Sequence, residues 1–224
     1  WWDNQGCTND GNKELEWYRP ENIQVANNAL NLVAEQKTFT NPNGKQFQYT
    51  SGMVTTGRSS SDNSQPVRFA FQYGFAEIRA KVPTGKGIWP AFWLLPADNT
   101  HLPEIDVMEF VGDKPKDVIM TIHFTGSDGN PTQAQSEWKG NVDLSQGWHT
   151  YGIDWGPDHI TWYIDGVERF KFDQANAIPQ VPMYLLLNLA VGGYWVGYPD
   201  GNTTFPSTFA VDYVRVWQKP NSAN

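Results

Sequence analysis

Three carboxylic acids stand close together in one otherwise apolar stretch, residues 103–110. Side chains alternate between the two faces of a β-strand, so Glu104 and Asp106 share one face and the apolar residues around them point into the core. Strict alternation would bury Glu109 on the core face, where an unpaired carboxylate is costly. An extra residue at Met108, in a β-bulge, returns Glu109 to the face of the other two acids. The sequence therefore predicts a bulged strand whose three acids line one groove.

The spacing of the two glutamates fits a glycosidase that retains the configuration of the sugar. Their backbones lie roughly 13 Å apart in a regular strand, and side chains that lean together can close this to ~5–5.5 Å, the carboxyl separation of retaining enzymes. One carboxylate attacks the anomeric carbon, while the other protonates the leaving oxygen and then activates water. Asp106, between them, is expected to raise the pKa of the glutamate that serves as the acid. Spacing alone does not assign the two roles.

Two other interpretations of the acid stretch are weaker. A solvated face of an edge strand is the first, but edge strands usually carry Lys or isolated charges rather than three acids. A Ca²⁺ or Mg²⁺ site is the second, because closely spaced carboxylates bind these ions. No further cluster of acids or Asn flanks the stretch, so a metal site ranks third.

The composition excludes several classes of protein. Of the 224 residues, 39% are hydrophobic and only 18% are charged, which is typical of neither a disordered chain nor a coiled coil. The net charge of −8 argues against nucleic acid as a partner, because phosphates need a basic surface. No apolar run approaches the ~18 residues of a membrane span. Aromatic residues make up 14% of the chain, including 11 Trp, and flat apolar rings are what a sugar face packs against.

The cysteine content and the start of the chain bear on the cellular location of the protein, but neither decides it. The lone Cys7 can form no disulfide within the chain. The start, Trp1-Trp2-Asp3-Asn4, lacks the charged and then apolar segments of a signal peptide, and a secreted protein in its mature form would begin in the same way. We expect an extracellular protein that acts as a monomer.

Short strands dominate the rest of the chain. Turn signals such as Asn41-Pro42-Asn43-Gly44 and Asp165-Gly166 separate runs of β-branched and aromatic residues. We expect strands at Leu30–Ala34, Gly52–Thr56, Phe69–Val82, Ile88–Leu95, Ile105–Phe110, Val118–Phe124, Trp148–Trp155, His159–Ile164, Val167–Phe172, Met183–Leu189 and Phe209–Trp217. Helix is limited to one expected turn at Phe172–Asn176. This pattern predicts an all-β fold, a jelly-roll β-sandwich of two antiparallel sheets, with residues 1–224 as one domain.

Two tryptophans stand beside the acid stretch in the sequence. Trp89 and Trp93 lie four residues apart on an expected strand, so they share one face, while Phe92 and Leu94 take the opposite face and are expected in the core. Core packing is the alternative for the two tryptophans, because Trp is usually largely buried. We favour contact with a sugar for both.

Three further residues are candidates for the same groove. His123 takes the face opposite to its apolar neighbours, although a lone His is more often structural than catalytic. Asn188 interrupts an apolar strand, so its amide needs a partner, either a sugar or a buried hydrogen bond. Trp195 follows Gly192-Gly193, which indicates a loop at the rim of the groove, where its ring could stack on a sugar.

The acid stretch and the segment before it resemble glycoside hydrolase family 16. The resemblance rests on Gly87-Ile88-Trp89-Pro90-Ala91-Phe92-Trp93-Leu94-Leu95-Pro96 and on Glu104-Ile105-Asp106-Val107-Met108-Glu109. The most similar branch is that of the bacterial laminarinase-like endo-β-1,3(4)-glucanases. Other segments that recur in the family are 11–18, 55–58, 121–123, 148–151, 162–166, 188–193 and 211–216.

The resemblance implies a cleft across a concave sheet and retaining hydrolysis within β-glucan chains such as laminarin, with no cofactor for catalysis. It assigns Glu104 as the nucleophile, Glu109 as the general acid/base and Asp106 as the acid that modulates them. It supports substrate contacts at Asn12, Arg58, Trp89, Trp93 and His123. Asn188 and Trp195, argued above from the sequence pattern, complete the expected set.

The family also carries a structural calcium ion, held by an Asp of the last strand and by backbone carbonyls. Asp212 matches that Asp, and Asn28 falls near one carbonyl donor, while an ion pair of Asp212 with Arg215 is the alternative. The family usually has a further strand before the point where this chain begins, supplying another ligand. Its absence here weakens the calcium expectation and predicts an open sheet edge.

Rival functions follow from the same scaffold. The groove has few charges besides its acids, which suits a neutral polysaccharide, whereas a sulfated galactan would call for clustered Lys and Arg. An agar-type galactan hydrolase therefore ranks above a carrageenan hydrolase. A transglycosylase and a non-catalytic glucan-binding lectin also fit the scaffold, although a lectin would be free to lose the acids.

Overall fold

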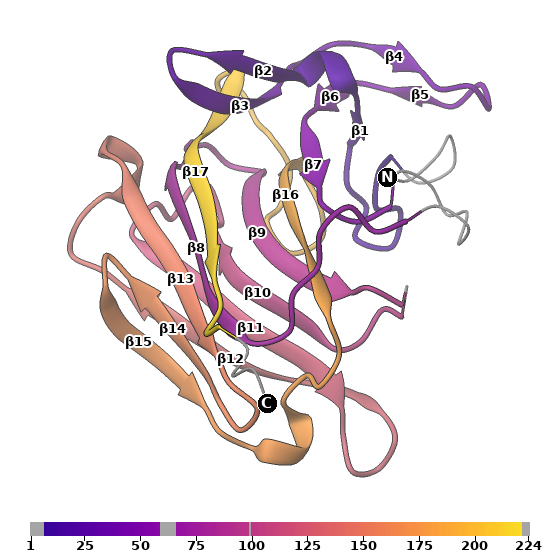
Figure 1. Cartoon of the computed structure of the whole chain (residues 1–224). Coiled ribbons are helices and arrows are strands. Elements are labelled where there is room, and N and C mark those ends of the chain that lie inside the picture. Colours follow the sequence, from indigo (N-terminus) through magenta and orange to yellow (C-terminus); the bar gives the residue numbers. More distant parts are fainter. Residues whose placement is uncertain (1–6, 59–65, 99, 221–224) are drawn as a thin grey trace.

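The computed structural model describes residues 7–58, 66–98 and 100–220. The start of the chain at Trp1, on which the signal-peptide argument rests, lies outside these ranges. Two large antiparallel sheets pack face to face (Figure 1). One has six strands, in the order β12 (Pro131–Lys139), β11 (Asp117–Thr125), β10 (Glu104–Glu109), β9 (Ile88–Pro96), β16 (Met183–Val191) and β7 (Met53–Thr55).

The second sheet has seven strands. Their order is β15 (Val167–Phe172), β14 (Ile160–Ile164), β13 (His149–Trp155), β8 (Gly74–Lys81), β17 (Ser207–Trp217), β3 (Ala29–Ala34) and β2 (Ile23–Ala26). Within the described ranges, β2 ends this sheet, and its Val25 is 85% exposed. This edge of the sheet is therefore exposed in the described part of the chain.

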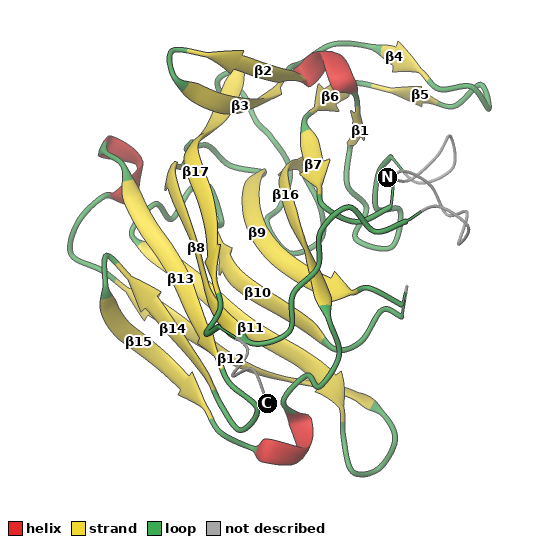
Figure 2. Cartoon of the chain, in the orientation of Figure 1, coloured by secondary structure: helices red, strands yellow, loops and turns green. Residues whose placement is uncertain are grey.

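Smaller elements cover one end of the sandwich (Figure 2). β1 (Glu16–Tyr18) pairs in parallel with β6 (Tyr49–Ser51), and β4 (Phe39–Thr40) pairs with β5 (Gln46–Phe47). Helical structure in the described residues is limited to the 3₁₀ turns η1 (Pro20–Asn22), η2 (Leu144–Gln146) and η3 (Ala175–Ala177). None of these helices has the length and apolar character needed to cross a membrane.

The all-β prediction is confirmed, and each predicted strand overlaps an observed one. The prediction was wrong in the first part of 69–82, because Tyr73, just before β8, has a positive φ angle of 61°, which extended strands do not adopt. The helical turn expected at 172–176 forms later, at Ala175–Ala177. β12 was not predicted, because this edge strand alternates exposed polar residues with half-buried ones.

The space between the sheets is filled by apolar side chains from both. Phe92 and Leu94 are fully buried there, as predicted from the alternation around Trp93. Tyr151 and Trp162 meet them from the seven-stranded sheet. Each such side chain contributes roughly 1.5–3 kcal/mol by leaving water, so this core holds the six-stranded sheet rigidly from behind.

Candidate active site

The predicted bulge in the acid strand is present. β10 lies between β9 and β11 (Figure 1), and its pairing with each neighbour shifts register after Asp106. Val107 and Met108 are both buried in the core, so the strand turns two successive side chains inward. Glu104, Asp106 and Glu109 consequently all line one cleft on the outer face of the six-stranded sheet.

The cleft has a volume of about 360 Å³. Four acids and His123 are the titratable side chains on its wall besides Tyr18, and no Lys or Arg of the described chain lines it. The wall is formed by Asn9, Asn12, Glu14, Tyr18, Met53, Trp89, Ala91, Trp93, Glu104, Asp106, Glu109, Thr121, His123, Gln133, Gln135, Asn188 and Trp195. Such a mixture of indole rings, amides and acids suits an uncharged, hydroxyl-rich ligand.

Both predicted tryptophans line the cleft and are fixed through their N–H groups. The indole Nε1–H of Trp89 donates a 3.0 Å hydrogen bond to Oε1 of Glu109. That of Trp93 donates a 2.8 Å hydrogen bond to Oδ1 of Asn188. Trp195, on the rim and 45% exposed, meets Trp89 edge to face with 4.9 Å between ring centroids.

His123 faces the acids. Its Nε2 lies 3.2 Å from Oδ2 of Asp106 and 3.7 Å from Oε1 of Glu104. The strand register explains this, because His123 on β11 is the direct partner of Glu104 on β10. The imidazole can therefore place a positive charge beside the carboxylate that the family resemblance assigns as the nucleophile.

The acids hold protons more strongly than exposed carboxyl groups do. Burial raises the pKa of Glu104 to about 8, with a further rise from the charge of Asp106 and an opposing effect of His123. Burial also raises the pKa of Asp106 to about 7. For Glu109, burial is again the largest cause, followed by Asp106 and then Glu104, and its pKa lies well above the ordinary range, although the bond from Trp89 lowers it. Asp106 does raise the pKa of its neighbours as predicted, but burial is the larger cause.

The buried hydrogen bonds that we weighed for Asn188 are present, while its contact with a sugar stays a prediction. It lines the cleft, and it is also buried and hydrogen-bonded on both sides. Its Oδ1 accepts from Trp93, and its Nδ2 donates a 3.0 Å hydrogen bond to the hydroxyl group of Tyr18. Asn12 also lines the cleft, with its Nδ2 donating to Oε1 of Glu14 at 2.9 Å.

Arg58 is the predicted contact that the structure does not bring to the acids. It is absent from the residues that line the cleft, and its Nη1 donates a 2.7 Å hydrogen bond to the carbonyl of Ala97. It directly precedes residues 59–65, which lie outside the described ranges. Contact of Arg58 with substrate stays a prediction.

Sequence reasoning missed several residues of the cleft wall. Gln133 and Gln135 belong to β12, the strand that we did not predict, and Thr121 lies two residues before His123 on the same face. Glu14 and Tyr18 come from the segment in which only Asn12 was singled out. Alternation along residues 14–18, with three polar side chains at even positions, was the available signal for the last two.

The structure describes both residues that were expected to hold calcium, Asp212 and Asn28. Oδ2 of Asp212 lies 2.5 Å from Nη1 of Arg79, so its ion-pair partner is Arg79 and not the Arg215 that we considered. Asn28 lies exposed in the turn between β2 and β3. Calcium takes six to eight oxygen ligands. In the described parts of the chain, the only group of three or more His, Cys, Asp or Glu ligand atoms within 4.8 Å of one another is formed by Glu104, Asp106 and His123.

Comparisons with known proteins agree with the geometry. The family model described as glycosyl hydrolases family 16 matches residues 12–215. The chain is 36% identical over 230 residues to the endo-1,3-1,4-beta-glycanase EglC of Rhizobium meliloti, covering 97% of this chain and 46% of the relative. It is 34% identical over 232 residues to the glucan endo-1,3-beta-glucosidase A1 of Niallia circulans, covering 93% and 33%. The chain thus spans less than half the length of these two relatives.

Solved structures of glucanases also superpose on this chain. The catalytic domain of the laminarinase from Thermotoga maritima superposes with a TM-score of 0.82 at 34% identity, covering 97% of this chain and 88% of that one. The endo-beta-1,3-glucanase from Pyrococcus furiosus superposes with a TM-score of 0.81 at 35% identity, covering 94% and 82%.

Proposed function

Because this chain belongs to glycosyl hydrolases family 16, we propose that it hydrolyses β-1,3 linkages within neutral β-glucan chains, retaining the configuration of the sugar. Mixed β-1,3/1,4 chains are included, since the relatives carry names of both specificities. One observation carries the proposal: Glu104, Asp106 and Glu109 line one tryptophan-walled cleft on a bulged strand. Two carboxyl groups in a common cleft are the machinery that glycoside hydrolysis needs.

The first step breaks the glycosidic bond. An oxygen of the Glu104 carboxylate attacks the anomeric carbon, and the bond from that carbon to the leaving oxygen breaks. Glu109 gives its proton to the leaving oxygen and becomes a carboxylate. The Nε1–H of Trp89 stabilises that carboxylate through its hydrogen bond to Oε1.

The second step releases the enzyme. The Glu109 carboxylate takes a proton from water, and the water oxygen attacks the anomeric carbon of the glycosyl-Glu104 ester. The ester bond breaks, Glu104 leaves as a carboxylate and Glu109 is again protonated. Two displacements on opposite faces restore the original configuration.

Glu104 ionises in this pocket only if a neighbouring group accepts its proton. Its pKa of about 8 disfavours the carboxylate near neutral pH, because the group is buried and lies beside Asp106. Two groups lie near enough to Glu104 to accept its proton: Asp106, whose side chain lies within hydrogen-bonding range, and His123, whose Nε2 lies 3.7 Å from Oε1 of Glu104. A proton on either of them leaves Glu104 ionised, while Glu109 keeps its own.

A neutral substrate is proposed because the cleft wall carries acids without a compensating Lys or Arg in the described chain. Sulfate or uronate groups would meet these acids at short range, where like charges repel strongly. The name of one relative, a glucan endo-1,3-beta-glucosidase, agrees with a glucan substrate.

A substrate panel tests the proposal. Purified protein is incubated with laminarin, lichenan, agarose and carrageenan, and the oligosaccharide products are identified over time. We expect laminarin to be cleaved fastest, at internal bonds, and Glu104→Gln to lose turnover by a factor of about 10³ or more. Preference for a galactan refutes the glucanase assignment, absence of cleavage with retained binding favours a lectin, and longer products at high acceptor concentration indicate transglycosylation.

Three further expectations concern the location of the protein, its oligomeric state and bound calcium. An extracellular location follows from a substrate too large to enter a cell, and monomeric behaviour can be checked by size-exclusion chromatography with light scattering. Structural calcium stays a prediction of the family resemblance, which the pairing of Asp212 with Arg79 disfavours. An unchanged thermal midpoint after removal of calcium with EGTA would count against it.

A further inference from the structure

A second pair of carboxyl groups lies at the cleft and takes no part in the mechanism above. Glu16, at the start of β1, is fully buried, and its Oε2 accepts a 2.7 Å hydrogen bond from the backbone N–H of Val191. Its Oε1 is buried and has no N–H or hydroxyl donor of its own. The carboxyl group of Glu14 lies against it, within hydrogen-bonding range.

Two carboxylate oxygens can lie side by side in a buried place only if a proton is between them. Tyr18 supports this protonated pair from the other side. Its hydroxyl oxygen accepts from Nδ2 of Asn188 at 3.0 Å, and its hydroxyl group lies near the Glu16 carboxyl group. Glu16 is thus anchored to β16 by Val191, and Tyr18 beside it is anchored to the same strand by Asn188.

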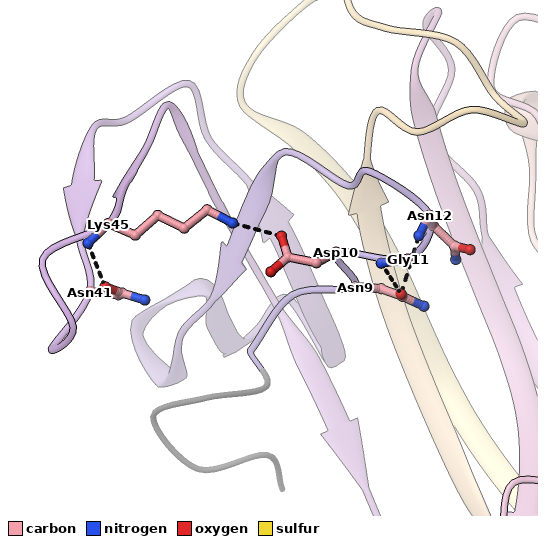
Figure 3. A network of polar contacts seen from close by, with 6 residues as sticks. All are labelled: Asn9, Asp10, Gly11, Asn12, Asn41 and Lys45. Atoms are coloured by element: carbon pink, nitrogen blue, oxygen red, sulfur yellow. Dashed lines mark hydrogen bonds and ion pairs between the residues drawn. The ribbon is translucent and has the colours of Figure 1, made fainter.

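Glu14 is held from the cleft side as well. Nδ2 of Asn12 donates to its Oε1 at 2.9 Å. The turn before it is closed by Asn9, whose Oδ1 accepts from the backbone N–H groups of Gly11 and Asn12 at 3.1 and 3.3 Å (Figure 3).

The same turn is tied to the rest of the fold. Figure 3 shows Asp10 joined to Lys45 of the β4–β5 turn, with 2.6 Å between Oδ1 and Nζ. The backbone N–H of Tyr194, on the rim loop, donates to the carbonyl of Asn12 at 2.9 Å. The segment that carries Glu14 is therefore fixed to two separate parts of the molecule.

The Glu14 carboxylate can accept one further hydrogen bond from a ligand. A carboxylate accepts roughly four hydrogen bonds, and Asn12, Glu16 and the backbone of Asn9 account for three. Its side chain is part of the cleft wall. A sugar hydroxyl is the donor that a neutral glucan would bring to the remaining position.

We propose that Glu14 is a further substrate-contacting residue, which accepts a hydrogen bond from a sugar hydroxyl group, and that Glu16 is the positioning residue that holds it through a shared proton. The inference rests on the proposed function, because it takes the ligand to be a glucan. Hydrogen bonds to a charged carboxyl group are stronger than neutral ones, so this contact contributes to substrate affinity on one side of the scissile bond.

Four variants test the proposal by steady-state kinetics on laminarin. Glu14→Ala is expected to raise KM about tenfold, with kcat within roughly twofold of wild type, because it removes binding and not chemistry. Glu16→Gln is expected to keep KM within about twofold, since its amide donates to Glu14 in place of the shared proton while its oxygen still accepts from Val191. Glu16→Leu and Glu16→Asp break the contact with Glu14 and are expected to raise KM as Glu14→Ala does. Glu21→Gln, an exposed acid of the same segment, is the control.

A binding measurement separates this inference from the proposed function. Laminarihexaose is titrated by calorimetry into Glu104→Gln protein with and without Glu14→Ala, and about tenfold weaker binding is expected in the double variant. If wild type cleaves laminarin but Glu14→Ala leaves KM and binding unchanged, this inference alone is overturned. Equal KM for Glu16→Gln and Glu16→Asp overturns the role of Glu16, and circular dichroism identifies any variant that has not folded. If wild type cleaves no glucan, the proposed function fails.

Discussion

The indole Nε1–H of Trp162 donates a 2.8 Å hydrogen bond to the backbone carbonyl of Asp106. Trp162 belongs to β14 of the seven-stranded sheet, and Asp106 to β10 of the opposite one. Asp106 is the residue at which the regular pairing of β10 with both neighbours ends. The bulge that brings Glu109 to the cleft is thus held from behind by the other sheet.

Replacing Trp162 by Phe removes this donor and leaves the buried Asp106 carbonyl without it. We expect the free energy of unfolding to fall by about 1–3 kcal/mol and kcat to fall as well, because the acids lose their fixed spacing. Urea denaturation and initial rates on laminarin measure the two effects. Trp155→Phe is the matched control, since Trp155 is equally buried and donates to the carbonyl of Pro179, away from the acids. It is expected to cost stability alone, and equal losses of kcat in both variants would contradict the argument.

The face that the acids and the tryptophans of β9 take could be predicted from local alternation. Glu104 and Asp106 share a face at a spacing of two residues, and the cost of burying Glu109 indicated the bulge at Met108. Trp89 was placed in the same way. These predictions needed only the period of a strand and the chemistry of each side chain.

The contacts that hold the site could not be predicted in that way. Trp162 and Asp106 are 56 residues apart, and no local pattern indicates which buried indole meets which carbonyl. The pairing of Glu16 with Glu14 depends on β1 lying against the end of β16, through the carbonyl and N–H of Val191. Such relationships arise from the packing of distant strands.

The hydrogen bond from Trp89 to Glu109 makes a prediction about pH dependence. The N–H group stabilises the ionised form of Glu109 and lowers its pKa, so Trp89→Phe is expected to raise that pKa. Because Glu109 must be protonated to act as the acid, the alkaline limb of kcat/KM moves to higher pH. Trp93→Phe is the control, since its N–H group meets Asn188 and no acid. An alkaline limb that stays in place, or moves to lower pH, contradicts this role of Trp89.

Removing the charge of Asp106 is expected to change the pH profile of kcat/KM in a different way. A neighbouring carboxylate disfavours a second negative charge, so Asp106 raises the pKa of both Glu104 and Glu109. Asp106→Asn is expected to lower both values, and both limbs of the pH profile of kcat/KM move to lower pH. Asp113→Asn, an exposed acid just beyond the same strand, should leave the profile in place. Movement of only one limb would show that Asp106 acts on one glutamate alone.

The raised pKa of Glu109 also implies that the active site is stabilised by protonation. An unfolded chain releases this proton at a pKa of ~4.3, whereas the folded protein keeps it to well above the ordinary range. Between these two values the folded state binds more protons, so its stability falls as pH rises. Below both values the group is protonated in both states, and its full contribution to stability is present.

Glu109→Gln removes this dependence, because the amide is neutral at every pH. We expect the variant to unfold at a higher denaturant concentration than wild type at about pH 8, where the buried acid costs the folded state most, and to differ little at about pH 4. Urea midpoints at the two pH values measure this, in the absence of substrate. Glu168→Gln, an exposed acid on β15, is the control and should show no such difference. A gain of equal size at both pH values would mean that Glu109→Gln acts through packing and not through the proton.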